Sequence, residues 1–176
     1  MIFIMKQLLF LSFATLFLFS CNKQVAYEAA FARSERIFNQ FKHQSNNSYT
    51  FVLTTHSWTN FSSETTLHVK NGKVTGRNYV AKNARHVNGE WQFEIVKQYN
   101  ETAANINSHT EGFKAITLDE IYDKAKNEIL KVDRKANTIY FEAKNNGMIS
   151  SVGYVPKECA DDCFIGYTVS RIEPID

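Results

Sequence analysis

This sequence has no long hydrophobic run and no large excess of positive or negative charge, and it contains little proline or cysteine. Its apolar run from Leu8 to Phe19 covers 12 residues, which is too short for a helix that spans a bilayer, since about 20 are needed. The 20 basic and 18 acidic residues nearly balance and form no basic block, so the charge pattern of a nucleic-acid-binding protein is missing. With two prolines, no repeats and no low-complexity tract, the chain reads as one domain with a core of its own.

The start of the chain has the pattern of a bacterial lipoprotein signal. Lys6 supplies a positive charge, the apolar run follows, and Leu18-Phe19-Ser20-Cys21 matches a lipobox. We therefore expect residues 1–20 to be a signal peptide that is removed. Cys21 would then carry a diacylglyceryl group whose fatty acyl chains, such as palmitate, anchor the protein in the membrane. The alternative is an ordinary signal peptide that happens to end near a cysteine.

These features predict where the protein works. Asn22 is not the aspartate that often retains lipoproteins at an inner membrane, so we expect the outer membrane of a Gram-negative envelope, on the side facing the periplasm. Residues 21–26 would form a short tether, and residues 27–176 a single domain. Lys6 is the only charged residue removed with the signal, which leaves 19 basic and 18 acidic residues.

The other two cysteines are close together in the sequence. Cys159 and Cys163 enclose a short loop that contains Asp161 and Asp162. A redox pair needs a lowered thiol pKa, which these carboxylates oppose, and a metal site needs further ligands nearby. We therefore expect a structural disulfide, which contributes about 2 kcal/mol by the chain-entropy model.

The pattern of apolar residues predicts the secondary structure. Helical spacing indicates helices at 25–43 and 118–132, the second preceded by a capping box between Thr117 and Glu120. Alternation and Asn-Gly turns predict hairpins around Asn71-Gly72 and Asn145-Asn146-Gly147. The expected strands are 49–54, 65–69, one from residue 73, 91–95, 139–141, 149–155 and 165–169, with loops at 60–63, 82–88 and 156–163, and with 100–115 as the loop of highest expected mobility.

The order of these elements predicts an α+β fold. A helix comes first, then several strands joined by tight turns, then a second helix and three more strands. Tight turns make the sheet antiparallel, and a sheet with one wet face needs its other face covered. We predict a two-layer sandwich, in which two helices cover one face of an antiparallel sheet of about six to seven strands.

Several segments together resemble a family of small, uncharacterised bacterial lipoproteins that carry one domain of unknown function. They are Ser48-Tyr49-Thr50-Phe51, Val69-Lys70-Asn71-Gly72-Lys73-Val74, Thr117-Leu118-Asp119-Glu120-Ile121-Tyr122, the strand from Gly147 to Tyr154, and Asp161-Asp162 followed by Gly166-Tyr167-Thr168-Val169-Ser170. The resemblance covers residues 35–173 and implies fold and location, since the family has no established activity. This chain departs from the family at Thr55-His56-Ser57-Trp58, where members often have a cysteine pair.

No motif indicates catalysis, a metal or another cofactor. His56 and His68 with Glu64 would make an incomplete metal site, and Ser57 or Ser62 near His56 lacks the glycine motif of a serine hydrolase. We therefore predict a non-catalytic module that binds a protein or another component of the envelope. The alternatives are an inhibitor or small-ligand carrier and, less favoured, a hydrolase. The candidate binding residues are three aromatics, which either anchor a partner or cap the open edge of the sheet: Trp58, Phe61 and Trp91.

Overall fold

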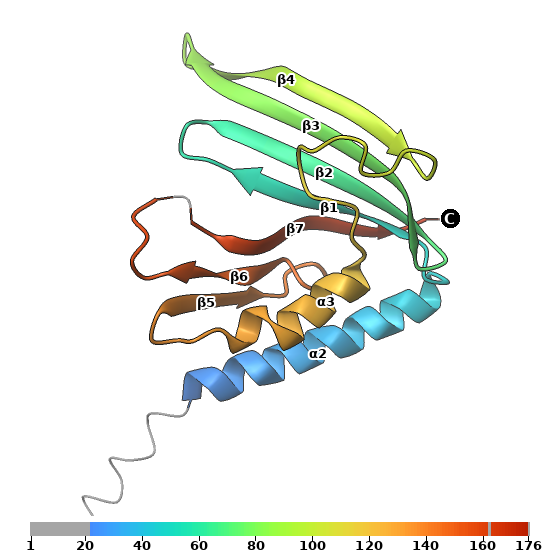
Figure 1. The fold of residues 1–176 in the computed structure, drawn as a ribbon, viewed down its shortest axis with the longest axis vertical. Helices are drawn as coiled ribbons and strands as arrows, with labels where there is room; N and C mark the ends of the chain where they lie inside the picture. Colours follow the sequence, from blue (N-terminus) through green and yellow to red (C-terminus); the bar gives the residue numbers. More distant parts are fainter. Residues whose placement is uncertain (1–21, 162, 176) are drawn as a thin grey trace, which may run out of the picture.

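A computed structural model describes residues 22–161 and 163–175, with side chains from Tyr27 onward. Cys21 and the predicted signal peptide lie outside the described residues. Figure 1 shows the arrangement of the elements. In chain order they are α2 (Asn22–Gln44), β1 (Tyr49–His56), β2 (Phe61–Lys70), β3 (Lys73–Val87), β4 (Glu90–Thr102), α3 (Leu118–Asn127), the 3₁₀ helix η2 (Ile129–Lys131), β5 (Asn137–Glu142), β6 (Ser151–Pro156) and β7 (Ile165–Pro174).

The strands form one antiparallel sheet. Its order is β4-β3-β2-β1-β7-β6-β5, so two meanders, β1 to β4 and β5 to β7, are joined where β1 pairs with β7. The α+β class and the predicted antiparallel sheet of about six to seven strands are confirmed, with seven strands. The edge strands are β4 and β5.

Asparagine–glycine turns fix the hairpins. Asn71 and Gly72 both have positive φ, 49° and 76°, as the tight turn between β2 and β3 requires. Asn88 and Gly89 repeat this geometry, with φ of 53° and 88°. The predicted loop at 82–88 is therefore wrong, because β3 continues to Val87 and turns directly into β4.

Both predicted helices are present. α2 begins at Asn22, so residues 22–26, predicted as a tether, are helical. The capping box of α3 is formed as predicted, because the Thr117 side chain accepts from the Glu120 backbone N–H and the Glu120 side chain accepts from the Thr117 backbone N–H. α3 ends at Asn127, and η2 extends the turn to Lys131.

The core lies between β1 and the helices. Tyr49, Phe51 and Leu53 alternate along β1 and are fully buried. The Tyr49 ring packs edge-on against Phe38 of α2, with centroids 6.2 Å apart, and its hydroxyl accepts a hydrogen bond of 3.2 Å from the Leu118 backbone N–H at the start of α3. Burial raises the pKa of the Tyr49 hydroxyl far above its ordinary value, which keeps this group neutral.

Candidate functional site

β1 and β7 pair along only part of their lengths. The ladder between them ends at Leu53↔Val169, next to an irregularity in the register. Beyond this point residues 54–56 stay paired with β2, and residues 165–168 stay paired with β6. Within the described part of the chain, the facing edges of the two strands therefore have no strand partner.

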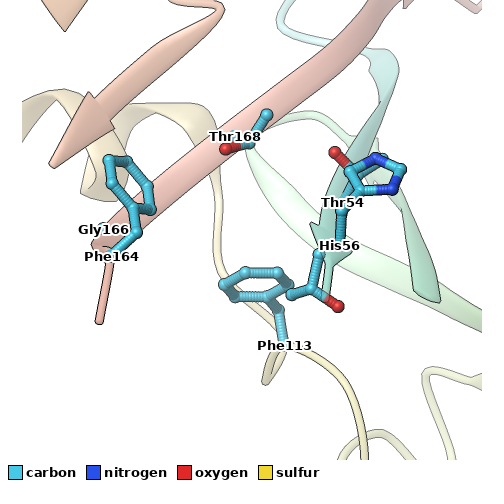
Figure 2. A pocket seen from close by; sticks show the side chains of 7 residues that line it. Thr54, His56, Phe113, Phe164, Gly166 and Thr168 are labelled. Atoms are coloured by element: carbon cyan, nitrogen blue, oxygen red, sulfur yellow. The ribbon is translucent and has the colours of Figure 1, made fainter. Parts of the chain in front are cut away.

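A cavity of about 400 Å³ lies where the two strands separate. Figure 2 shows side chains from three elements around it. We call it the strand-gap cavity, and its lining combines two phenyl rings with hydroxyl groups and one imidazole. The lining residues are Thr54, Thr55, His56, Phe113, Phe164, Gly166 and Thr168.

The lining comes from both faces of the sheet. Thr54 and His56 lie on the face of β1 opposite that of Leu53, because side chains alternate along a strand. Phe113 belongs to the segment between β4 and α3, and its backbone N–H donates to Thr65 Oγ1 over 3.1 Å. Thr65 is paired with Leu53 and so shares its face, which places Phe113 on the helix side of the cavity.

Two glycines allow the Phe164 ring and the start of β7 to lie close to β6. A Cβ atom on Gly153 would lie 2.4 Å from the Phe164 ring, and one on Gly166 would lie 2.2 Å from the Val152 carbonyl oxygen. Any larger side chain at either position would force these groups apart. The Phe164 ring also packs edge-on near Tyr140, with centroids 6.4 Å apart, so it has a defined place although it is 40% exposed.

A buried arginine holds Phe113 in position. Arg77 of β3 is fully buried, and its Nε donates to the Phe113 carbonyl oxygen over 2.7 Å. Its other nitrogens donate to the carbonyl oxygens of His109, over 3.4 Å, and of Glu111. One guanidinium group thus ties three points of the 103–117 segment to the sheet.

Glu101 balances the charge of this arginine. Its Oε1 lies 2.9 Å from Arg77 Nη1, and both side chains are fully buried. The same carboxylate accepts hydrogen bonds from the backbone N–H groups of Asn107 (2.7 Å) and His109 (2.8 Å) and from the Ser108 hydroxyl. Burial alone would raise the pKa of Glu101, but these hydrogen bonds and the guanidinium lower it to about 2.

Aromatic rings cover the ion pair. Tyr99 stacks on His109, with centroids 4.0 Å apart and planes within 8°, and on Tyr79, with centroids 5.1 Å apart. Its ring also lies 5.2 Å from the Arg77 guanidinium carbon. The segment predicted as a mobile loop is therefore bound to β3 and β4 by an ion pair, hydrogen bonds and ring contacts.

The three predicted aromatic binding residues do not form one cluster. Trp58 lies in the β1–β2 turn and is 75% exposed, and Trp91 near the β3–β4 turn is 55% exposed. Phe61 is half-buried and pairs with Asn83. The Trp91 ring contacts the His86 ring at 5.2 Å, so only the two tryptophans present large exposed surfaces.

The other candidate residues have separate places. His68 contacts Thr50 and Asn78, each at 3.2 Å, while His56 lies at the far end of β1 opposite Ser62. The described residues contain no group of three or more potential metal ligands. Cys159 and Cys163 form the predicted disulfide, with their Cα atoms 6.3 Å apart.

Comparison with known proteins found no counterpart. No family model, no curated protein and no solved structure matches this chain. Among the described residues no helix is both long and apolar enough to cross a membrane.

Proposed function

We propose that this chain is a lipid-anchored protein of the bacterial cell envelope, attached through Cys21, and that its domain is a non-catalytic module that binds an extended polypeptide segment in the strand-gap cavity. We also infer a two-layer sandwich, with α2 and α3 on one face of the sheet, because Tyr49 contacts both helices. The observation that carries the binding role is the separation of β1 and β7 around the cavity.

Unpaired strand edges favour a polypeptide ligand. Backbone N–H and C=O groups at the edge of a sheet form the hydrogen bonds of an added strand, and pockets beside it accept alternate side chains. Here residues 54–56 supply the edge, while Phe113 and Phe164 supply apolar walls. His56 is the one ionisable side chain among the described lining residues, so the cavity suits binding better than general acid–base catalysis.

A random peptide library displayed on phage tests this function. Peptides selected on the wild-type protein should lose at least about tenfold in affinity for Thr168→Trp, in which the indole fills the cavity. They should bind Thr138→Trp unchanged, because Thr138 is exposed on β5. Equal binding to both variants would mean that the cavity is not the site, and Phe113→Ala offers a second variant that enlarges the cavity instead of filling it.

A small-ligand carrier is the second candidate. The volume of about 400 Å³ falls within the range of pockets that hold small molecules, roughly 300–1,000 Å³. Thermal-shift measurements with a medium-chain fatty acid and with N-acetylglucosamine test this candidate. A rise in melting temperature that Thr168→Trp abolishes and Thr138→Trp keeps would favour it over the peptide.

Mass spectrometry of the purified protein tests the anchor. We expect the mature chain to begin at Cys21 with a diacylglyceryl group, and Cys21→Ser to release the protein from the membrane fraction. A mature chain that begins elsewhere, or an unmodified Cys21 thiol, would contradict the anchor without affecting the binding role of the cavity.

A further inference from the structure

The topology gathers several turns at the end of the domain where α2 begins. Because β1 returns beside α2, the turn at 57–60 lies at the same end as Asn22. The antiparallel strands then bring back the turn at 88–89 and the loop at 157–164. Figure 1 shows the start of α2 and these connections along the left side of the molecule. We call this the anchor end.

The anchor end carries most of the large exposed aromatic side chains among the described residues. Both tryptophans of the chain lie there, Trp58 with 75% and Trp91 with 55% of its surface exposed. Phe93, with 67%, lies two residues after Trp91 on β4, and Phe164, with 40%, is the last residue of the 157–164 loop. At the opposite end the turns are polar, with Asn46-Asn47, Asn71-Gly72 and Asn145-Asn146-Gly147. Among the described residues, Ile175 is the one large apolar side chain exposed there.

We propose that the anchor end rests on the lipid surface, with Trp58 and Trp91 inserted at the membrane–water interface. This inference depends on the proposed lipid anchor. Tryptophan is enriched at that interface because its ring is amphipathic. α2 begins one residue after Cys21, so no long linker separates the domain from its anchor.

The distribution of the aromatics fits a lipid surface. Trp58 lies on the turn between β1 and β2, Trp91 on β4 beside a second turn, and Phe164 at the end of a third connection. Shallow contact with a fluid surface needs no single complementary pocket. Close to Trp91, the charges of Arg85 and Glu94 pair with each other, so they need not be separated when the end approaches the headgroups. The strand-gap cavity then lies next to the membrane.

The two tryptophans are the reporters for the test. The full lipidated protein is reconstituted in vesicles of phosphatidylethanolamine and phosphatidylglycerol, with or without brominated acyl chains, which quench indole fluorescence on contact. Trp58→Phe and Trp91→Phe leave one tryptophan each and keep an aromatic ring at the changed position. The matched control carries both substitutions and Lys73→Trp, which places an indole on an exposed position at the opposite end.

We expect brominated lipid to reduce the fluorescence of wild type and of both single-tryptophan variants about twofold or more. The Lys73→Trp control should stay unquenched. Comparison of the two vesicle types cancels quenching within the protein, such as that of Trp91 by His86.

Vesicle flotation separates the outcomes. Protein that floats without quenching of Trp58 and Trp91 would overturn this inference and leave the anchor intact, whereas protein that does not float would overturn the anchor and, with it, this inference.

Discussion

The two halves of the β3–β4 hairpin share one ladder but differ in how far their side chains are buried. In the inner half, residues 76–81 pair with 97–102, and Arg77, Tyr79 and Ala81 are buried. In the outer half, residues 82–87 pair with 90–95, and every residue of β4 there is exposed. The inner half is covered by the 103–117 segment, and the outer half is bare.

A bulge separates these halves. The register shifts between Ala81 and Lys82, so that Ala81 pairs with Lys97 and Lys82 pairs with Ile95. One extra residue reverses which face the following side chains occupy. The outer half of β4 therefore has three apolar side chains on the face opposite Tyr99 and Glu101, namely Trp91, Phe93 and Ile95. The extra residue therefore turns this apolar row of β4 away from the face that the 103–117 segment covers in the inner half.

Removing the charge of Arg77 should have the largest effect. Arg77→Met leaves Glu101 buried without its cation and frees three carbonyl oxygens of the 103–117 segment, so we expect a loss of about 3–5 kcal/mol in the free energy of unfolding. Urea denaturation measures this loss.

The double variant Arg77→Met/Glu101→Leu is the control for this experiment. It removes both buried charges together, so its loss of stability should be smaller than the sum of the losses for Arg77→Met and Glu101→Leu. A double variant as unstable as the sum of the two single variants would mean that the pair is not coupled as its 2.9 Å contact indicates.

Acid should weaken the inner half. The pKa of Glu101 is lowered from 4.5 to about 2, so the folded protein favours the ionised carboxylate more than the unfolded chain does. This contribution is fully present above about pH 4.5 and is lost as the pH falls toward about 2. Urea denaturation from about pH 6 to about pH 2 should show a smaller dependence on pH for Glu101→Gln than for wild type. Identical slopes would contradict the assigned pKa.

Two glycines allow a matched comparison of the halves. Gly112, with φ of 72°, lies over the inner half, and an added Cβ would be 2.6 Å from both Thr65 Oγ1 and Tyr79 Cδ2. Gly89, with φ of 88°, lies in the outer turn and has no atom within 4 Å of an added Cβ. Gly89→Ala should therefore cost about 1 kcal/mol from backbone strain alone, and Gly112→Ala roughly 2–3 kcal/mol, because its contacts add to the strain. Thermal unfolding of the two variants checks the order.

The features that could be predicted from the sequence are those formed by residues close together in the chain. Asn71-Gly72, the Thr117 capping box and the Cys159–Cys163 disulfide were all predicted and are present. Asn88-Gly89 carries the same signal as Asn71-Gly72, but residues 82–86 before it show no apolar alternation. A hairpin that is exposed on both faces buries no row of side chains, so its sequence need not alternate. Without alternation the sequence indicates a loop there.

Neither the strand-gap cavity nor the buried ion pair beneath the 103–117 segment could be predicted from neighbouring residues. Arg77 and Glu101 are charged residues at inward positions of their strands, and only the register brings them together. The cavity depends on the place where β1 and β7 stop pairing, next to the irregularity at Val52 and Leu53. Such a feature arises from the twist and packing of the whole sheet, although Gly153 and Gly166 are a local signal of close approach.

The smallest effect on stability should come from the outer half. Phe93→Ala removes a ring that is 67% exposed, so we expect a change of less than about 0.5 kcal/mol in the free energy of unfolding. The matched variant Tyr79→Ala removes a ring that is 5% exposed in the inner half, and should cost about 3–5 kcal/mol. Urea denaturation of both variants distinguishes them. A large loss for Phe93→Ala would mean that the outer half helps to hold the fold. A negligible loss would mean that the exposed Phe93 ring is not needed for folding and is available for the proposed contact with the membrane.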